Sequence, residues 1–143
     1  MSDKYKELYE KYPEFVKDRF GGFAIGDGWF DIVDVLCFCI TNHITSHNEQ
    51  VTSALEKIQS GLDIAQEYMP EELIMKAYPT INQVKEKFGG LRFYVSGGDP
   101  IIWAYIRFAE YMASKTCEEC GAPGTRHNTG WIRTLCATHA TVK

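Results

Sequence analysis

Two pairs of metal-binding residue types near the end of the chain constrain its fold more than any other sequence feature. Cys117 and Cys120 are separated by two residues, and after a further fifteen residues Cys136 and His139 repeat that spacing. Such paired spacing is typical of a four-coordinate Zn²⁺ site, in which three thiolates and one imidazole close a tetrahedron. We therefore expect a structural Zn²⁺ with no open position for a catalytic water. His127 lies between the pairs and is the alternative to His139 as the fourth ligand.

The chain has 143 residues and five cysteines, which are best interpreted as reduced thiols. No apolar run approaches the ~20 residues needed to cross a bilayer, and the first residues lack the apolar segment of a secretory signal. We therefore expect a cytoplasmic protein, in which cysteines bind metal or fill the core rather than form disulfides. A CxxC pair also occurs in redox proteins, but the βαβ setting of that class is missing here.

Apolar residues at helical spacing predict four helices before the metal-binding residues. Pro13 is expected to divide the first helix, Asn48 to cap the third, and Pro70 to end it. Asp99 and Pro100 have the residue types of an N-cap and a first helical position. The expected helices cover about 3–19, 29–44, 48–69 and 100–112, and the expected core stripe of the last one is Ile101, Tyr105, Phe108 and Met112.

After Pro79 apolar and polar residues alternate, which indicates β-strands. Two such runs flank Gly89 and Gly90 and predict a β-hairpin near 81–96. The expected fold class is α+β: a mostly helical core over residues 1–115 that includes the hairpin, followed by a zinc-binding module over residues 116–143. A zinc ribbon and a truncated treble clef are both consistent with the ligand spacing.

One face of the predicted hairpin is cationic and also carries an aromatic ring. Arginine offers a planar fork, lysine a point charge and tyrosine a stacking surface, a combination that suits a phosphate joined to a base or sugar. The alternative is a solvated face whose charges keep a sheet edge soluble. Trp131 and Arg133 give the predicted zinc hairpin a similar character. The residues placed on the hairpin face by strand alternation are Lys85, Lys87, Arg92 and Tyr94.

Charge is distributed unevenly along the chain, whose net charge is −4. Residues 1–80 hold 7 basic against 14 acidic side chains, and residues 81–143 hold 8 against 5. Proteins that coat duplex DNA usually present a strongly basic face, so bulk attraction to DNA is not expected. A small phosphorylated ligand needs only a few local positive groups, which the second part of the chain supplies.

These features favour a non-enzymatic binding protein that captures a phosphorylated nucleotide on the hairpin face. No nucleophile elbow, HExxH sequence, P-loop or kinase motif is present. One alternative is a nucleic-acid or protein adaptor that acts through the zinc hairpin around Trp131 and Arg133, and another is a metal-dependent nuclease. His43 and His47 are four residues apart on one helix face and could form a second metal site in addition to the Cys/His site.

Four segments together resemble a group of small uncharacterised zinc-binding proteins that are common in bacteriophage genomes. They are Gly-Asp-Gly-Trp-Phe-Asp at 26–31, Gln-Val-Lys-Glu-Lys-Phe-Gly-Gly-Leu-Arg-Phe-Tyr at 83–94, Thr-Cys-Glu-Glu-Cys-Gly-Ala-Pro-Gly at 116–124 and Gly-Trp-Ile-Arg-Thr-Leu-Cys-Ala-Thr-His at 130–139. The resemblance implies a phage protein that acts in the cytoplasm of a bacterial host. It also implies a role on nucleic acid or against host defence, in which case the nucleotide would be a defence signal.

Overall fold

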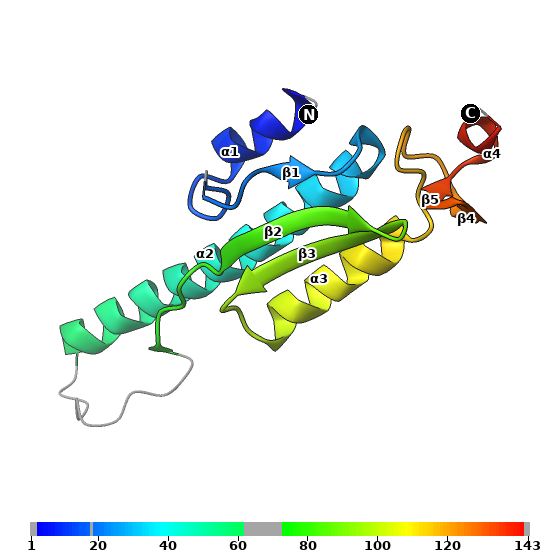
Figure 1. Cartoon of the computed structure of the whole chain (residues 1–143). Coiled ribbons are helices and arrows are strands. Elements are labelled where there is room, and N and C mark those ends of the chain that lie inside the picture. The colour runs from blue at the N-terminus through cyan, green and yellow to red at the C-terminus, as the bar shows by residue number, and fades with distance from the viewer. Residues whose placement is uncertain (1–2, 18, 62–72, 142–143) are drawn as a thin grey trace.

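The fold is arranged around a single long helix, α2 (Figure 1). The computed structural model describes residues 3–17, 19–61 and 73–141. Within them α2 spans Phe30–Gly61 and begins directly after a 3₁₀ turn, η2, at Asp27–Trp29. Its buried stripe faces the main core, and the fold as a whole mixes this helix with two small sheets. None of the helices in the described part of the chain has the length and apolarity to span a membrane.

The expected break between two helices at Asn48 is wrong. Its side-chain amide donates to the Lys76 carbonyl oxygen at 2.9 Å, and its oxygen accepts from the Lys76 amide at 2.8 Å. Asn48 therefore satisfies the backbone of a loop that lies beside α2, and a helix can pass through this position without a cap. Residues 62–69 of the predicted third helix lie outside the described residues.

The N-terminal helical segment is shorter than the sequence predicts. A 3₁₀ turn, η1, covers Asp3–Lys6, and α1 covers only Glu7–Lys11. Tyr12 has φ −133° and ψ 60°, because a residue that precedes a proline is forced out of the helical region. The chain beyond Pro13 instead lines one side of the main core. Buried aromatic residues of this N-terminal part are Tyr5, Tyr12, Phe15, Phe20 and Phe23.

The larger sheet has the strand order β1-β2-β3, with β1 parallel to β2 and β2 antiparallel to β3. The bounds are Phe23–Ala24 for β1, Thr80–Lys87 for β2 and Gly90–Ser96 for β3. Strands β2 and β3 form the hairpin that the alternating pattern predicts. Their inward side chains, Ile81, Val84, Leu91 and Phe93, are buried in the main core.

Helix α3 spans Pro100–Ala113 and lies against both α2 and β3 (Figure 1). Asp99 caps it by accepting from the Ile102 amide at 2.9 Å, and Pro100 takes the first helical position, as predicted. The expected core stripe is wrong, because Phe108 is 69% exposed and Met112 is 41% exposed. A neighbouring stripe with two alanines faces the core instead, since small side chains let the helix approach the sheet closely. It consists of Ile102, Ile106, Ala109 and Ala113.

Asp99 also joins three parts of the fold through its side chain. Its Oδ2 lies 2.8 Å from His43 Nε2 on α2 and 2.7 Å from Lys76 Nζ in the loop before β2. Burial by itself raises the pKa of Asp99. The hydrogen bonds from Lys76, His43 and the Ile102 amide outweigh that effect and hold its pKa well below the ordinary range.

We expect Asp99→Asn to have a lower free energy of unfolding than the wild type near neutral pH. The difference between the two free energies should become smaller in acid. The pKa of Asp99 is lower in the folded than in the unfolded chain, where it is ~3.9. The stability from ionised Asp99 is therefore complete above that value and is lost as pH falls toward the folded pKa. Urea unfolding between about pH 6 and pH 3 measures this difference in free energy. A difference that stays constant over this range would contradict the conclusion that ionised Asp99 stabilises the fold.

Candidate metal centre

The metal-binding residues lie on a turn, a hairpin and a short helix at the end of the chain. Cys117 and Cys120 lie in the turn after α3, which is closed by a hydrogen bond of 3.0 Å from the Gly121 amide to the Cys117 carbonyl oxygen. Strands β4, Thr125–Thr129, and β5, Trp131–Leu135, then pair antiparallel and return the chain to that turn. Cys136 caps the helix α4, Ala137–Ala140, whose first turn also carries His139.

The structure brings Cys117, Cys120, Cys136 and His139 into one cluster, with all ligand atoms within 4.8 Å of one another. Cys136 Sγ lies 3.8 Å from Cys120 Sγ and 3.2 Å from His139 Nδ1, and Cys117 Sγ lies 3.6 Å from the same nitrogen. A tetrahedron with metal–sulfur bonds of about 2.3 Å has sulfur–sulfur edges of about 3.8 Å. The cluster therefore has the size and the donor set to hold one metal ion.

The electrostatics of the cluster favour a thiolate ligand. The His139 amide and the His139 imidazole both stabilise the Cys136 thiolate and lower the pKa of Cys136 to about 6. Because metal ions bind the thiolate rather than the thiol, this ligand is largely deprotonated at neutral pH. By contrast, burial raises the pKa of Cys37 in the main core, so this cysteine behaves as a small apolar side chain.

The other histidines have different partners. His127 points its Nε2 at Thr125 Oγ1 and at the Leu135 carbonyl oxygen, each at 3.3 Å. His43 pairs with Asp99, and His47 Nε2 lies 2.6 Å from the Ile74 carbonyl oxygen. Among the described residues, the Cys₃His cluster is the only group of three or more potential ligands with this geometry. His139, rather than His127, is thus the fourth member.

Two glycines allow the metal-binding turn to dock on the core. The Gly28 amide donates to the Glu118 carbonyl oxygen at 2.8 Å, and the buried Trp29 indole donates to the Thr116 carbonyl oxygen at 2.9 Å. A Cβ atom at Gly28 would overlap the carbonyl groups of residues 117 and 118, and one at Gly26 would overlap that of residue 118. Glycine is therefore required at both positions because backbone packs directly on backbone.

A buried carboxylate completes this docking, and nothing in the sequence pattern marks it. Glu118 is only 5% exposed, and its carboxylate accepts from the Thr134 amide at 2.6 Å. The Thr134 hydroxyl in turn donates to the Gly89 carbonyl oxygen at 2.6 Å, in the β2-β3 turn. Burial raises the pKa of Glu118, although the Thr134 amide and Arg133 act against it. Glu118 thus connects the metal-binding turn to β5, and Thr134 connects β5 to the hairpin.

The four predicted residues of the hairpin face lie on the outer side of the β2-β3 sheet. Lys85 pairs directly with Arg92 across the strands, and Gln83 pairs with Tyr94. Lys87 and Tyr94 are exposed, whereas Lys85 and Arg92 are half-buried. Adjacent cationic side chains on one face create a local positive field in an otherwise acidic chain.

Beside this face, the tips of the two hairpins enclose a groove of about 300 Å³. Glu86, Lys87 and Phe88 line it from the β2-β3 tip, and Trp131 and Ile132 line it from the β4-β5 tip. The Glu86 carboxylate accepts from the Gly89 amide at 2.7 Å. Phe88 has a positive φ of 53° and is 60% exposed, and Trp131 is 75% exposed. The Arg133 side chain, by contrast, has acidic partners: it forms an ion pair with Glu119 and lies 3.9 Å from Glu118.

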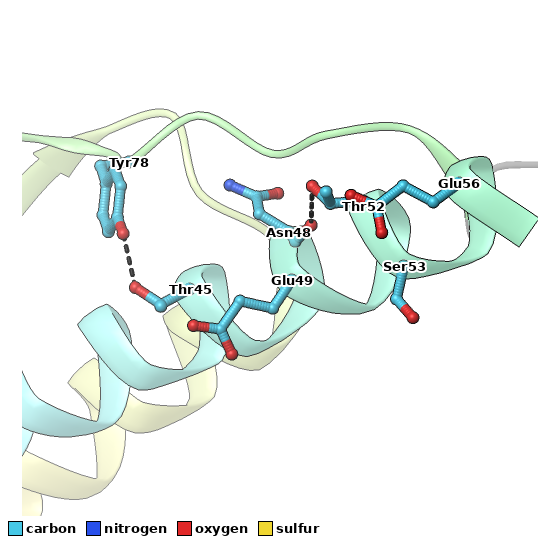
Figure 2. Close-up of a pocket in the computed structure, with 7 residues that line it drawn as sticks. All are labelled: Thr45, Asn48, Glu49, Thr52, Ser53, Glu56 and Tyr78. Carbon is cyan, nitrogen blue, oxygen red and sulfur yellow. Dashed lines mark hydrogen bonds between the residues drawn. The ribbon is translucent and has the colours of Figure 1, made fainter.

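A second hollow, of about 360 Å³, lies along the far half of α2 (Figure 2). Its lining is rich in hydroxyl groups, and Thr45 Oγ1 lies 2.5 Å from Tyr78 Oη. Glu49 and Glu56 also line it, with no cation among the lining residues. The negative charge makes this hollow unsuitable for phosphate. The groove between the hairpin tips instead contains a cation, Lys87, and its one acidic lining residue, Glu86, is bonded to the Gly89 amide.

Comparison with known proteins identifies no matching family model, curated protein or solved structure.

Protein purified under reducing conditions is expected to carry one metal ion per chain, and Cys120→Ser is expected to lose it. Binding at structural zinc sites contributes ~10–16 kcal/mol in small zinc modules, so removal of one ligand should also disorder the segment after Lys115. Elemental analysis and thermal unfolding measure the two effects. Cys39→Ser, which removes a thiol outside the cluster, is the matched control and should keep its metal. A metal-free wild type, or full metal content in Cys120→Ser, would overturn the assignment.

Proposed function

We propose that the chain is a non-enzymatic, zinc-stapled protein that binds a phosphorylated nucleotide where its two hairpin tips meet. The observation that carries the proposal is the groove between those tips. Two exposed aromatic rings, Phe88 and Trp131, line it together with Lys87 and with Glu86, whose carboxylate is bonded to the Gly89 amide. The cross-strand pair of Lys85 and Arg92 lies on the neighbouring sheet face. A ligand that joins an aromatic base to a phosphate matches this arrangement.

The cluster geometry supports Zn²⁺ as the metal. Three sulfur donors and one nitrogen donor are a standard structural zinc set, and four protein ligands leave no position for a catalytic water. The element order supports a truncated treble clef rather than a ribbon, since Cys136 and His139 lie at the start of the helix α4. In this proposal zinc has no role in chemistry. It fixes the β4-β5 hairpin, and with it Trp131, next to the β2-β3 tip.

Each side chain has a defined role in the proposed complex. Trp131 and Phe88 stack on the base, an interaction worth ~1–3 kcal/mol per base. Lys87 neutralises the phosphate as a point charge, and Arg92 binds it through its planar fork. Arg133, also expected from the sequence to contact ligand, forms an ion pair with Glu119 and lies 3.9 Å from Glu118. The net charge of −4 limits attraction to a long polyanion and so favours a small ligand.

Single-stranded nucleic acid is the second candidate ligand, and the exposure of Trp131 is the observation that favours it. Exposed aromatic rings stack on successive bases with little sequence preference. This adaptor function would depend on the zinc hairpin and hardly at all on Arg92. The two candidates therefore differ in whether Arg92→Ala weakens binding.

Calorimetric titration with mononucleotides, cyclic dinucleotides and ADP-ribose tests the proposal. Arg92→Ala should weaken binding by roughly 10- to 150-fold, the equivalent of ~1.5–3 kcal/mol for a charge-assisted hydrogen bond. Trp131→Ala should weaken it by about 5- to 150-fold through lost stacking. Arg107→Ala and Trp103→Ala, both on α3, are matched controls and should bind as the wild type does.

The outcome with oligonucleotides separates the two candidates. If none of the small ligands binds below about 100 μM, a free energy of only ~5.5 kcal/mol, the nucleotide proposal fails. Tight binding of a single-stranded oligonucleotide that depends on Trp131 and not on Arg92 would then establish the adaptor function.

A further inference from the structure

The outer face of α2 and α3 carries an apolar groove that no part of the described chain covers. The groove has a volume of about 680 Å³, lies on the two helices and shares no lining residue with the proposed nucleotide site. Val35 and Cys39 line it from α2, and Tyr105, Phe108 and Met112 line it from α3. Asp31 is the only charged lining residue.

Large apolar side chains continue on both sides of this groove. Phe108 is 69% exposed, Tyr111 61%, Val35 60% and Phe38 55%. Spacings of three and four residues place Phe108, Tyr111 and Met112 on one side of α3, and the same rule places Val35 and Phe38 together on α2. This is the face that the sequence periodicity of α3 predicts to be buried.

The exposed area is close to what a stable dimer needs. Aromatic side chains of about 150–250 Å² each at these exposures, with the aliphatic residues beside them, leave on the order of 600 Å² of apolar surface. Single soluble chains seldom expose a contiguous patch larger than ~300–600 Å². Two such faces in contact bury about 1,200 Å², the lower end of the range for specific protein interfaces.

The face is also suited to contact with the same face of a second copy of the chain. A twofold contact requires one surface to be complementary to itself. Here the Phe108 ridge of one chain can enter the groove of the other, and the reverse contact forms at the same time. Chains with a net charge of −4 repel each other in most orientations. On this face Asp31 is balanced by the Lys115 ammonium, which lies over the Tyr111 ring, so the repulsion between two copies is weak here. A membrane partner would instead require a basic rim, and Asp31 on this face opposes it.

We propose that the chain forms a twofold homodimer through the outer face of α2 and α3. Phe108 is the central contact and Val35, Phe38 and Met112 surround it. The two proposed nucleotide sites stay outside the interface, so dimer formation and nucleotide binding are independent properties. The result is a four-helix contact in which both α3 helices bury the apolar stripe that a single chain leaves in water.

Sedimentation equilibrium of the zinc-loaded full chain tests this inference. The wild type should sediment at twice its 16.3 kDa chain mass at 20 μM. Phe108→Glu should sediment as a monomer, with the dissociation constant raised at least 100-fold and with unchanged circular dichroism and metal content. Phe88→Glu places the same substitution at an exposed phenylalanine elsewhere and should remain dimeric. Val35→Glu, on the other helix, should act as Phe108→Glu does and serves if that variant does not fold.

Three results would overturn the proposal. They are a wild type that stays monomeric up to 200 μM, a Phe108→Glu dimer as stable as the wild type, and equal disruption by Phe88→Glu. A monomer that binds a small apolar ligand in the groove would likewise show that the second copy is the wrong occupant.

Discussion

Contact between the backbone of the metal-binding turn and the backbone of the Gly26–Gly28 loop is the constraint on which the rest of this structure depends. Side chains at these glycines would fill the space that the carbonyl groups of residues 117 and 118 occupy. The turn can dock there only if its own shape is fixed, and the cluster of four side chains from the turn, the α4 cap and α4 could hold the metal ion that fixes it. The small C-terminal module, which has little apolar core of its own, is held in place by this contact.

The same docking sets the position of the proposed nucleotide site. The buried Glu118 and Thr134 link the metal-binding turn to β5, and Thr134 links β5 to Gly89 in the β2-β3 turn. These links place Trp131, at the tip of one hairpin, across a groove from Phe88, at the tip of the other. In this account the proposed ligand site depends on the docking of the module, and the docking depends on metal binding.

The features that could be predicted from the sequence are those set by local spacing or by one residue type. Paired cysteine and histidine spacing identified the metal cluster, strand alternation around Gly89 identified the hairpin, and Asp99 with Pro100 identified the start of α3. The missed features depend on distant partners. Asn48 resembles a cap until Lys76 lies beside it, and the inner stripe of α3 depends on how closely that helix approaches the sheet. Glu118 resembles an exposed acid until the docked turn buries it.

Amide hydrogen exchange with and without metal is the most direct test of the claim that the ion holds the module on the core. With metal bound, the Gly28 amide should be protected because it donates a hydrogen bond across the docking contact. The Glu118 and Thr134 amides should be protected because each donates a hydrogen bond within the module, between the metal-binding turn and β5. After removal of the metal by a chelator, these amides should exchange freely while those in the middle of β2 and β3 stay protected. Equal protection of the Gly28 and Thr134 amides in the two states would contradict the account.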